Sequence, residues 1–255
     1  GSHNVAVGSG ALDANTTGNY NYALGKDALG ANTTGSVNVA IANALTANTT
    51  GENNIAIGSN SLGDNTIGGQ NVALGRQALG DNTTGNNNTA VGHNALFYNT
   101  TGGNNTAIGR DALKANTTAS NSVAIGYFAL VANTTGTQNI AIGVETLDAN
   151  TTGSYNVAIG KAALGGNTTA NYNVAIGQGA LSANTTGTEN VAVGAFALDA
   201  NTTANNNTAI GYEALTANST GTQNAALGTH TLDSNTTGSD NTAIGFQALQ
   251  ANTTG

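Results

Sequence analysis

Side chains that commonly act as catalytic bases are scarce in this chain. It has no cysteine and three histidines, which are His3, His93 and His230. A serine or cysteine nucleophile needs an adjacent base that takes up its proton. His93 and His230 lie at variable positions far apart in the sequence, and no recurring serine or carboxylate accompanies them. We therefore predict that the protein is not an enzyme and needs no cofactor.

The acidic residues and glycines do not follow a pattern that binds metal ions or phosphate. The 13 acidic residues do not form the Gly-Gly-x-Gly-x-Asp repeat that binds calcium in another class of β-roll. The recurrent glycine has no Lys-Ser/Thr behind it, so it is not a phosphate-binding loop. Asp27 and Asp111 directly follow Lys26 and Arg110, which indicates charge pairs on the surface. We predict no metal site.

The recurrent Asn-Thr-Thr could carry two kinds of chemistry. It matches the acceptor pattern for N-glycosylation, interrupted only at Asn65-Thr66-Ile67. If the segment is extended, its asparagine and second threonine share one face. Stacked copies would then form two flat rows of short polar side chains, which would suit ice binding. The candidate binding face comprises Asn15, Thr17, Asn32, Thr34, Asn48, Thr50, Asn82, Thr84, Asn99, Thr101, Asn116, Thr118, Asn133 and Thr135.

These residues belong to a tandem repeat that fills the chain. Counting from the residue before each Val-Ala-Ile-like tripeptide, 15 units follow one another with a period of 17, apart from one step of 16. The consensus is N-[VT]-A-I-G-x-x-A-L-x-A-N-T-T-G-x-x, with alanine at position three, leucine at nine and asparagine at twelve in every unit. The units start at Asn4, Asn21, Asn38, Asn54, Asn71, Asn88, Asn105, Ser122, Asn139, Asn156, Asn173, Asn190, Asn207, Asn224 and Asn241.

The repeat favours short strands over helices. Asparagine, β-branched threonine and glycine together are poor helix formers, and no helical stripe outlasts one unit. Positions two to four predict one strand that ends at the glycine of position five, and positions eight to fourteen predict a second extended segment. We expect an all-β protein, a β-solenoid or parallel β-roll of fifteen 17-residue coils. Residues 1–3 read as a cloning remnant, and 4–255 as a single repeat domain.

Alternation along the first strand gives a further expectation. Positions two and four share one face, and the alanine of position three points the other way. If positions four and nine form the core, the alanines face outward and permit close approach of another chain. The candidate subunit interface comprises Ala6, Ala23, Ala40, Ala56, Ala73, Ala90 and Ala107.

Charge and hydropathy restrict the partners. The net charge is −8, and the five basic residues are scattered singly, so no stripe could follow a nucleic-acid backbone. No apolar run is long enough to span a membrane. Eleven of the 13 acidic residues and all five basic ones lie at positions six, seven, ten, sixteen and seventeen, which we expect to face water. Aromatic residues at six, seven and seventeen could stack on sugar rings: Tyr20, Tyr127, Phe128, Tyr155, Tyr172, Phe196, Tyr212 and Phe246.

The unit resembles a known repeat. Asn121-Ser122-Val123-Ala124-Ile125-Gly126 is similar to the N-S-V-A-[IL]-G signature of trimeric autotransporter adhesin heads, the YadA-like head repeats, and related pentapeptides recur in almost every unit. Similar repeats also occur in fibre proteins of bacterial surfaces and phage tails. The resemblance implies a left-handed roll, a homotrimer and attachment to surfaces, although the family's coil is shorter than the unit found here.

These expectations combine into one functional prediction and one alternative. We predict a rigid structural or adhesive segment of an extracellular fibre, on a cell surface or a virion. Its partners would be two further copies of the chain and a host-surface or glycan receptor, without nucleic acid and without membrane insertion by this segment. The alternative is an ice-binding solenoid that uses the Asn/Thr face.

Overall fold

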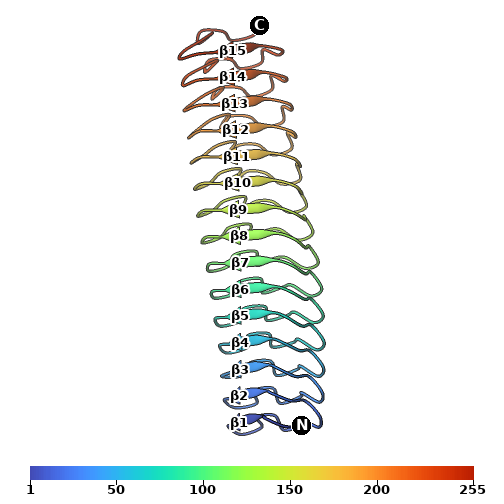
Figure 1. Cartoon of the computed structure of the whole chain (residues 1–255). Coiled ribbons are helices and arrows are strands. Elements are labelled where there is room, and N and C mark those ends of the chain that lie inside the picture. The colour runs from blue at the N-terminus through green and yellow to red at the C-terminus, as the bar shows by residue number, and fades with distance from the viewer. The chain divides into compact units, whose positions relative to one another are not determined.

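The computed structural model describes residues 1–255 and divides into two compact units, Gly1–Ser122 and Val123–Gly255. Each unit is a β-solenoid in which one three-residue strand per coil pairs in parallel with the strand of the next coil (Figure 1). The strands follow one another in sequence order within each unit. The structure contains no long apolar helix of the kind that spans a membrane.

The first unit holds β1 (Val5–Val7), β2 (Tyr22–Leu24), β3 (Val39–Ile41), β4 (Ile55–Ile57), β5 (Val72–Leu74), β6 (Thr89–Val91) and β7 (Thr106–Ile108). The second holds β8 (Val123–Ile125), β9 (Ile140–Ile142), β10 (Val157–Ile159), β11 (Val174–Ile176), β12 (Val191–Val193), β13 (Thr208–Ile210), β14 (Ala225–Leu227) and β15 (Thr242–Ile244). Equivalent residues of successive coils pair, as in Ala23 with Ala40, so each repeat position forms a ladder.

The second extended segment that we predicted is not a strand. Positions six to eleven form turns, and backbone hydrogen bonds between coils continue there without a strand, for example from Leu29 N to Ala44 O (3.2 Å). The leucine of position nine explains the difference, because its φ lies between 48° and 55° in every coil. This left-handed conformation costs about 1–2 kcal/mol per residue, whereas complete burial of a leucine stabilises by about 1.5–3 kcal/mol. Burial therefore offsets the strained turn.

The core of each coil is narrow and contains small residues around one large one. The leucines of position nine are fully buried from Leu29 to Leu232, together with alanines of positions three and eight. In the interior coils the asparagines of positions one and twelve are also buried, with Ser122 in place of one of them. No buried side-chain nitrogen or oxygen lacks a hydrogen-bond partner. Each coil thus encloses one leucine, small side chains and satisfied amides, and it has no room for a second large residue.

The shortened third coil differs from the others at its first turn. Its strand is followed by Ala42 with φ 71°, whereas glycine occupies this place in the other coils with φ between 125° and 141°. Alanine in the left-handed region costs about 1–2 kcal/mol. The deleted residue therefore leaves a strained alanine at the turn.

Replacement of this alanine should stabilise the protein. Ala42→Gly removes the strain and adds about 0.4–1 kcal/mol of chain entropy to the unfolded state. We expect a net gain of about 0.5–1 kcal/mol in the free energy of unfolding, measured by urea titration. Ala40→Gly, in the adjoining strand, is the control and should lose about 0.5–1 kcal/mol. Equal losses for both variants would contradict the assignment of strain to Ala42.

Candidate functional surface

The largest unusual surface is the outer face of each sheet. Side chains at positions two and four point outward from every strand, and none of them is buried. Of these 30 positions, four are threonine and the other 26 (30 − 4) are Val, Ile, Leu, Ala or Tyr. Ile57 is 38% exposed, Leu24 51% and Val7 55%. We call these two rows the aliphatic face, and it is present in both units.

The aliphatic face contains a hollow near the start of the first unit. This hollow has a volume of about 260 Å³ and is lined by Val5, Val7, Leu24, Val39 and Ile41, with the ring of Tyr22 on its wall. It spans β1 to β3, and apolar side chains form almost the whole lining. Contiguous apolar surface of this kind marks contacts with another molecule in soluble proteins.

The predicted alanine interface is wrong, although the alternation on which it was based is present. Positions two and four do share a face, but that face is the outer one. The alanines of position three point into their own coil, because only a small residue fits beside the buried leucine. Ala23, Ala40, Ala56, Ala73, Ala90 and Ala107 are between 0% and 1% exposed, and only Ala6 in the first coil is exposed. The buried alanines cannot contact a second chain.

The predicted Asn/Thr face is also wrong for its asparagine row. Asn32, Asn48, Asn82, Asn99, Asn116 and Asn133 are fully buried, and Asn15 is half-buried. The chain turns a corner at positions twelve to fifteen, so the two residues do not alternate as on a strand. Each amide turns inward, donates to the carbonyl of position fifteen in its own coil and reaches the amide of the preceding coil, as Asn99 does with Gly102 O (3.0 Å) and Asn82 Oδ1 (2.8 Å). The asparagine ladder is thus present, but it lies inside the coil.

A second asparagine ladder at position one was not predicted to be internal. Asn71 illustrates it, with Nδ2 donating to Gly85 O (2.9 Å) and Oδ1 accepting from the backbone N of Asn88 (2.9 Å). Recurrence of asparagine before nearly every strand was the available signal. The two ladders join the strand of a coil to its corner, and they bond each coil to the next.

Threonines of position fourteen do form an exposed row. Thr17, Thr34, Thr50, Thr101, Thr118 and Thr135 are exposed, and Thr84 is half-buried. The acceptor asparagines of the Asn-x-Thr pattern, in contrast, are buried in the interior coils. N-glycosylation of these asparagines would therefore require local opening of the folded coil.

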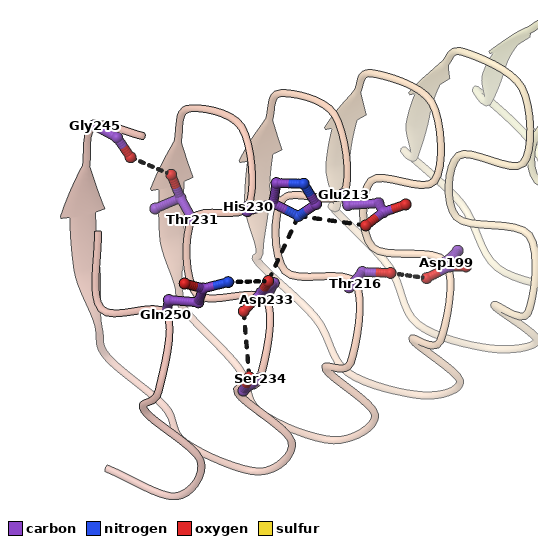
Figure 2. A network of polar contacts seen from close by, with 9 residues as sticks. All are labelled: Asp199, Glu213, Thr216, His230, Thr231, Asp233, Ser234, Gly245 and Gln250. Atoms are coloured by element: carbon purple, nitrogen blue, oxygen red, sulfur yellow. Dashed lines mark hydrogen bonds and ion pairs between the residues drawn. The ribbon is translucent and has the colours of Figure 1, made fainter. Parts of the chain in front are cut away.

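Ionisable side chains of the second unit meet in one network on its surface (Figure 2). Nδ1 of His230 lies 3.3 Å from Glu213 Oε2 and 3.5 Å from Asp233 Oδ2. Gln250 donates to Asp233 Oδ2 (3.1 Å), and so ties the last coil to this network. The hydroxyl of Ser234 donates to Asp233 (3.2 Å) rather than to the imidazole, so it does not form a nucleophile–base pair. The structure has no group of three or more such side chains placed to hold a metal ion.

One acidic residue that we expected to face water is buried. The side chain of Asp111 is 4% exposed and lies 3.0 Å from Arg110 Nε and 3.4 Å from Lys114 Nζ. Burial alone would raise the pKa of Asp111, but the amide of Asn94 (2.9 Å) and the two cations lower it below its ordinary value. The predicted pairs with adjacent bases are present, since Lys26 also lies 3.7 Å from Asp27.

Two other acidic residues, Asp64 and Asp81, lie on adjoining coils and repel each other. Burial and the charge of Asp64 raise the pKa of Asp81. A carboxyl whose pKa is raised on folding destabilises the folded state while it is ionised, and this penalty disappears as the pH falls through the folded pKa.

Asp81→Asn should therefore increase stability near neutral pH and have no such effect near about pH 3. Both acids are partly exposed, so we expect a gain below about 1 kcal/mol, measured by thermal unfolding at both pH values. Asp64→Asn removes the same repulsion, and the double variant should gain less than the sum of the single ones. A gain that persists at the lower pH would show that charge is not its cause.

Neighbouring aromatic rings cover one another. Tyr155 and Tyr172 stack at 5.0 Å between ring centroids with an angle of 12° between the planes, and Tyr127 stacks on Phe128 at 4.1 Å. A sugar ring stacks on the face of an aromatic ring, so each pair offers only its outer faces. The rings thus form separate small sites rather than one platform.

No protein-family model, no curated protein and no solved structure matches this chain.

Proposed function

We propose that the protein is a rigid segment of an extracellular adhesive fibre, built from three parallel copies of the chain whose aliphatic faces meet. One observation carries this proposal: 26 of the 30 outward positions of the strands are apolar and none is charged. All 18 charged residues (5 + 13) lie at other positions of the coil. A surface that stayed in water would have no reason to be both apolar and free of charge in every coil.

The size of the aliphatic face supports an interface between copies. Strands lie about 4.8 Å apart, and two rows of side chains cover a width of about 10 Å. Seven strands then give about 340 Å² in the first unit, and eight give about 380 Å² in the second. The two faces together provide about 700 Å², which approaches the roughly 800 Å² that each partner buries in a stable complex. Two apolar faces of this size favour stable association over a transient contact.

The resemblance to the adhesin heads supports an assembly of three copies and a location outside the cell. In such a fibre the aliphatic faces form a shared interior, and the polar corners with their exposed threonines and aromatic rings remain outside. Repetition then presents the same polar corner many times, so that weak contacts with a host-surface or glycan receptor add up.

The absolute mass in solution tests this assembly. Light scattering on a size-exclusion column should give three times the 24.9 kDa of the single chain, independent of concentration. A mass of 24.9 kDa over the whole concentration range would refute the trimer. Adhesion has its own test, in which the fibre is passed over an array of immobilised glycans. Binding should weaken when Tyr155 and Tyr172 are both replaced by serine.

The exposed threonine row favours ice as a second candidate ligand. In the second unit, threonines of position fourteen are accompanied at position sixteen by Thr137, Ser154, Asn171, Thr188 and Asn205, with a buried Gly or Ala between. The side chains of position sixteen, rather than the buried asparagines, therefore form the second polar row beside the threonines. Ice binding predicts thermal hysteresis that Thr152→Tyr and Thr186→Tyr reduce, whereas a fibre without ice binding shows none.

A further inference from the structure

Near-identical coils leave the alignment of associated chains poorly defined. If two copies slide past each other by one coil, valines and isoleucines still face valines and isoleucines. Such a slip removes only one coil in fifteen from the contact. Register in repetitive sheets is therefore weakly specified unless a distinct side chain marks one position.

One side chain on the aliphatic face is distinct in this way. Position two is Val, Ile, Thr or Ala in fourteen coils and tyrosine only at Tyr22. This tyrosine lies in β2 and is 50% exposed. Beside it lies the hollow of about 260 Å³ between β1 and β3. Its volume equals that of about eight waters, which is enough to accept an aromatic ring.

We propose that Tyr22 sets the register of the assembly by inserting its ring into the hollow of a neighbouring copy. This inference depends on the proposed association through the aliphatic face. Each copy carries both the ring and the hollow, so three copies around an axis can satisfy every hollow in a closed ring. A slip by one coil would move Tyr22 from the middle of the hollow to its edge at β1 or β3, and a slip by two coils would carry it past the residues that line the hollow, so that the ring would hold the two sheets apart.

The absence of cysteine provides a clean way to measure the register. Ser59→Cys introduces a single thiol at an exposed position of the fourth coil, off the aliphatic face. A spin label on this thiol reports the distances between copies by pulsed electron paramagnetic resonance. In the labelled parent we expect one narrow distance. Addition of Tyr22→Val should leave the mass at that of three chains and broaden the distribution toward longer distances, because copies that slip by several coils are displaced axially by about 4.8 Å for each coil.

Two further variants separate a role in register from a general effect. Tyr22→Phe keeps the ring and should retain the single distance. Tyr20→Val removes a tyrosine that is also 50% exposed but lies off the face, and valine is accommodated at this position as Val37 in the next coil. It should also retain the single distance.

Each outcome decides between the two proposals. One narrow distance in trimeric Tyr22→Val would overturn the role in register and leave the trimer intact. A trimeric parent whose Tyr22→Val variant is monomeric would overturn it too, because Tyr22 would then be required for association itself. A labelled parent with a mass of 24.9 kDa and no distance between copies would overturn both proposals.

Discussion

Ile57→Asp is expected to reduce the mass of the assembly from that of three chains to the 24.9 kDa of one chain, without loss of the β-solenoid. Ile57 lies at position four of the repeat, where it ends β4, and in the free chain its side chain is 38% exposed. An aspartate there is tolerated by a single chain, since water can reach it. In the assembly it would be buried without a partner, at a cost of about 3–5 kcal/mol per copy. Three such charges would also repel one another.

Ser59→Asp provides the matched control for this prediction. It places the same charge two residues away, at an exposed position outside the aliphatic face. This variant should keep the mass of the parent, and both variants should retain the parent's circular dichroism spectrum. The prediction fails if Ile57→Asp stays trimeric, or if both substitutions dissociate the assembly equally. In the first case another surface joins the copies, and in the second the cause is net charge.

Much of the architecture could be predicted from the sequence, because the period of a tandem repeat can be read directly from its recurring residues. A pentapeptide similar to Asn-Val-Ala-Ile-Gly recurs once per unit and locates the strand, and the glycine at its end locates the turn. The asparagine of position twelve recurs in every unit, and this recurrence correctly predicted that these asparagines stack from coil to coil. Periodicity specifies which residues stack on which, because successive coils repeat the same geometry.

The direction in which side chains point could not be obtained from the period. Alternation places Ala40 opposite to Val39 and Ile41, and hydrophobicity alone then assigns the larger residues to the core. The structure has the opposite arrangement, because the space inside the coil is already occupied by Leu45 and two buried asparagines. Which face is inner thus depends on the volume of the coil, and that volume depends on turns that the sequence did not reveal.

The turns could not be predicted from the sequence, because they contain residues that rarely adopt turn conformations. Leucine at φ near 50° is unusual, and the extended segment predicted at positions eight to fourteen assumed ordinary backbone conformations. The same error brought Asn99 and Thr101 onto one face. In the structure the corner between them turns the amide inward and leaves the threonine outside.

Internal asparagines, rather than leucines alone, should hold successive coils together, and Asn99→Leu tests this. Leucine has nearly the shape of asparagine but cannot form hydrogen bonds. The substitution removes the bonds from Asn99 Nδ2 to Asn82 Oδ1 and Gly102 O, and the bond that Asn116 Nδ2 donates to Asn99 Oδ1 (2.8 Å). Asn82 Oδ1 is then buried without a partner, at a cost of about 1–3 kcal/mol, whereas Gly102 O keeps the bond from Asn88 Nδ2 (2.9 Å) and Asn116 Nδ2 keeps its bond to Ala119 O (3.1 Å). We expect a loss of about 2–4 kcal/mol in the free energy of unfolding, measured by urea titration.

Thr101→Val in the same coil is the control for the amide ladder. Thr101 is exposed, so loss of its hydroxyl should change stability by no more than about 0.5 kcal/mol. Hydrogen exchange adds spatial resolution, since each coil contacts only its neighbours. In Asn99→Leu, protection should fall first in coils five to seven, which share the broken bonds, while distant coils exchange as in the parent. If the apolar substitution is neutral, hydrophobic stacking of the leucines is sufficient, and the ladder contributes alignment of the coils rather than stability.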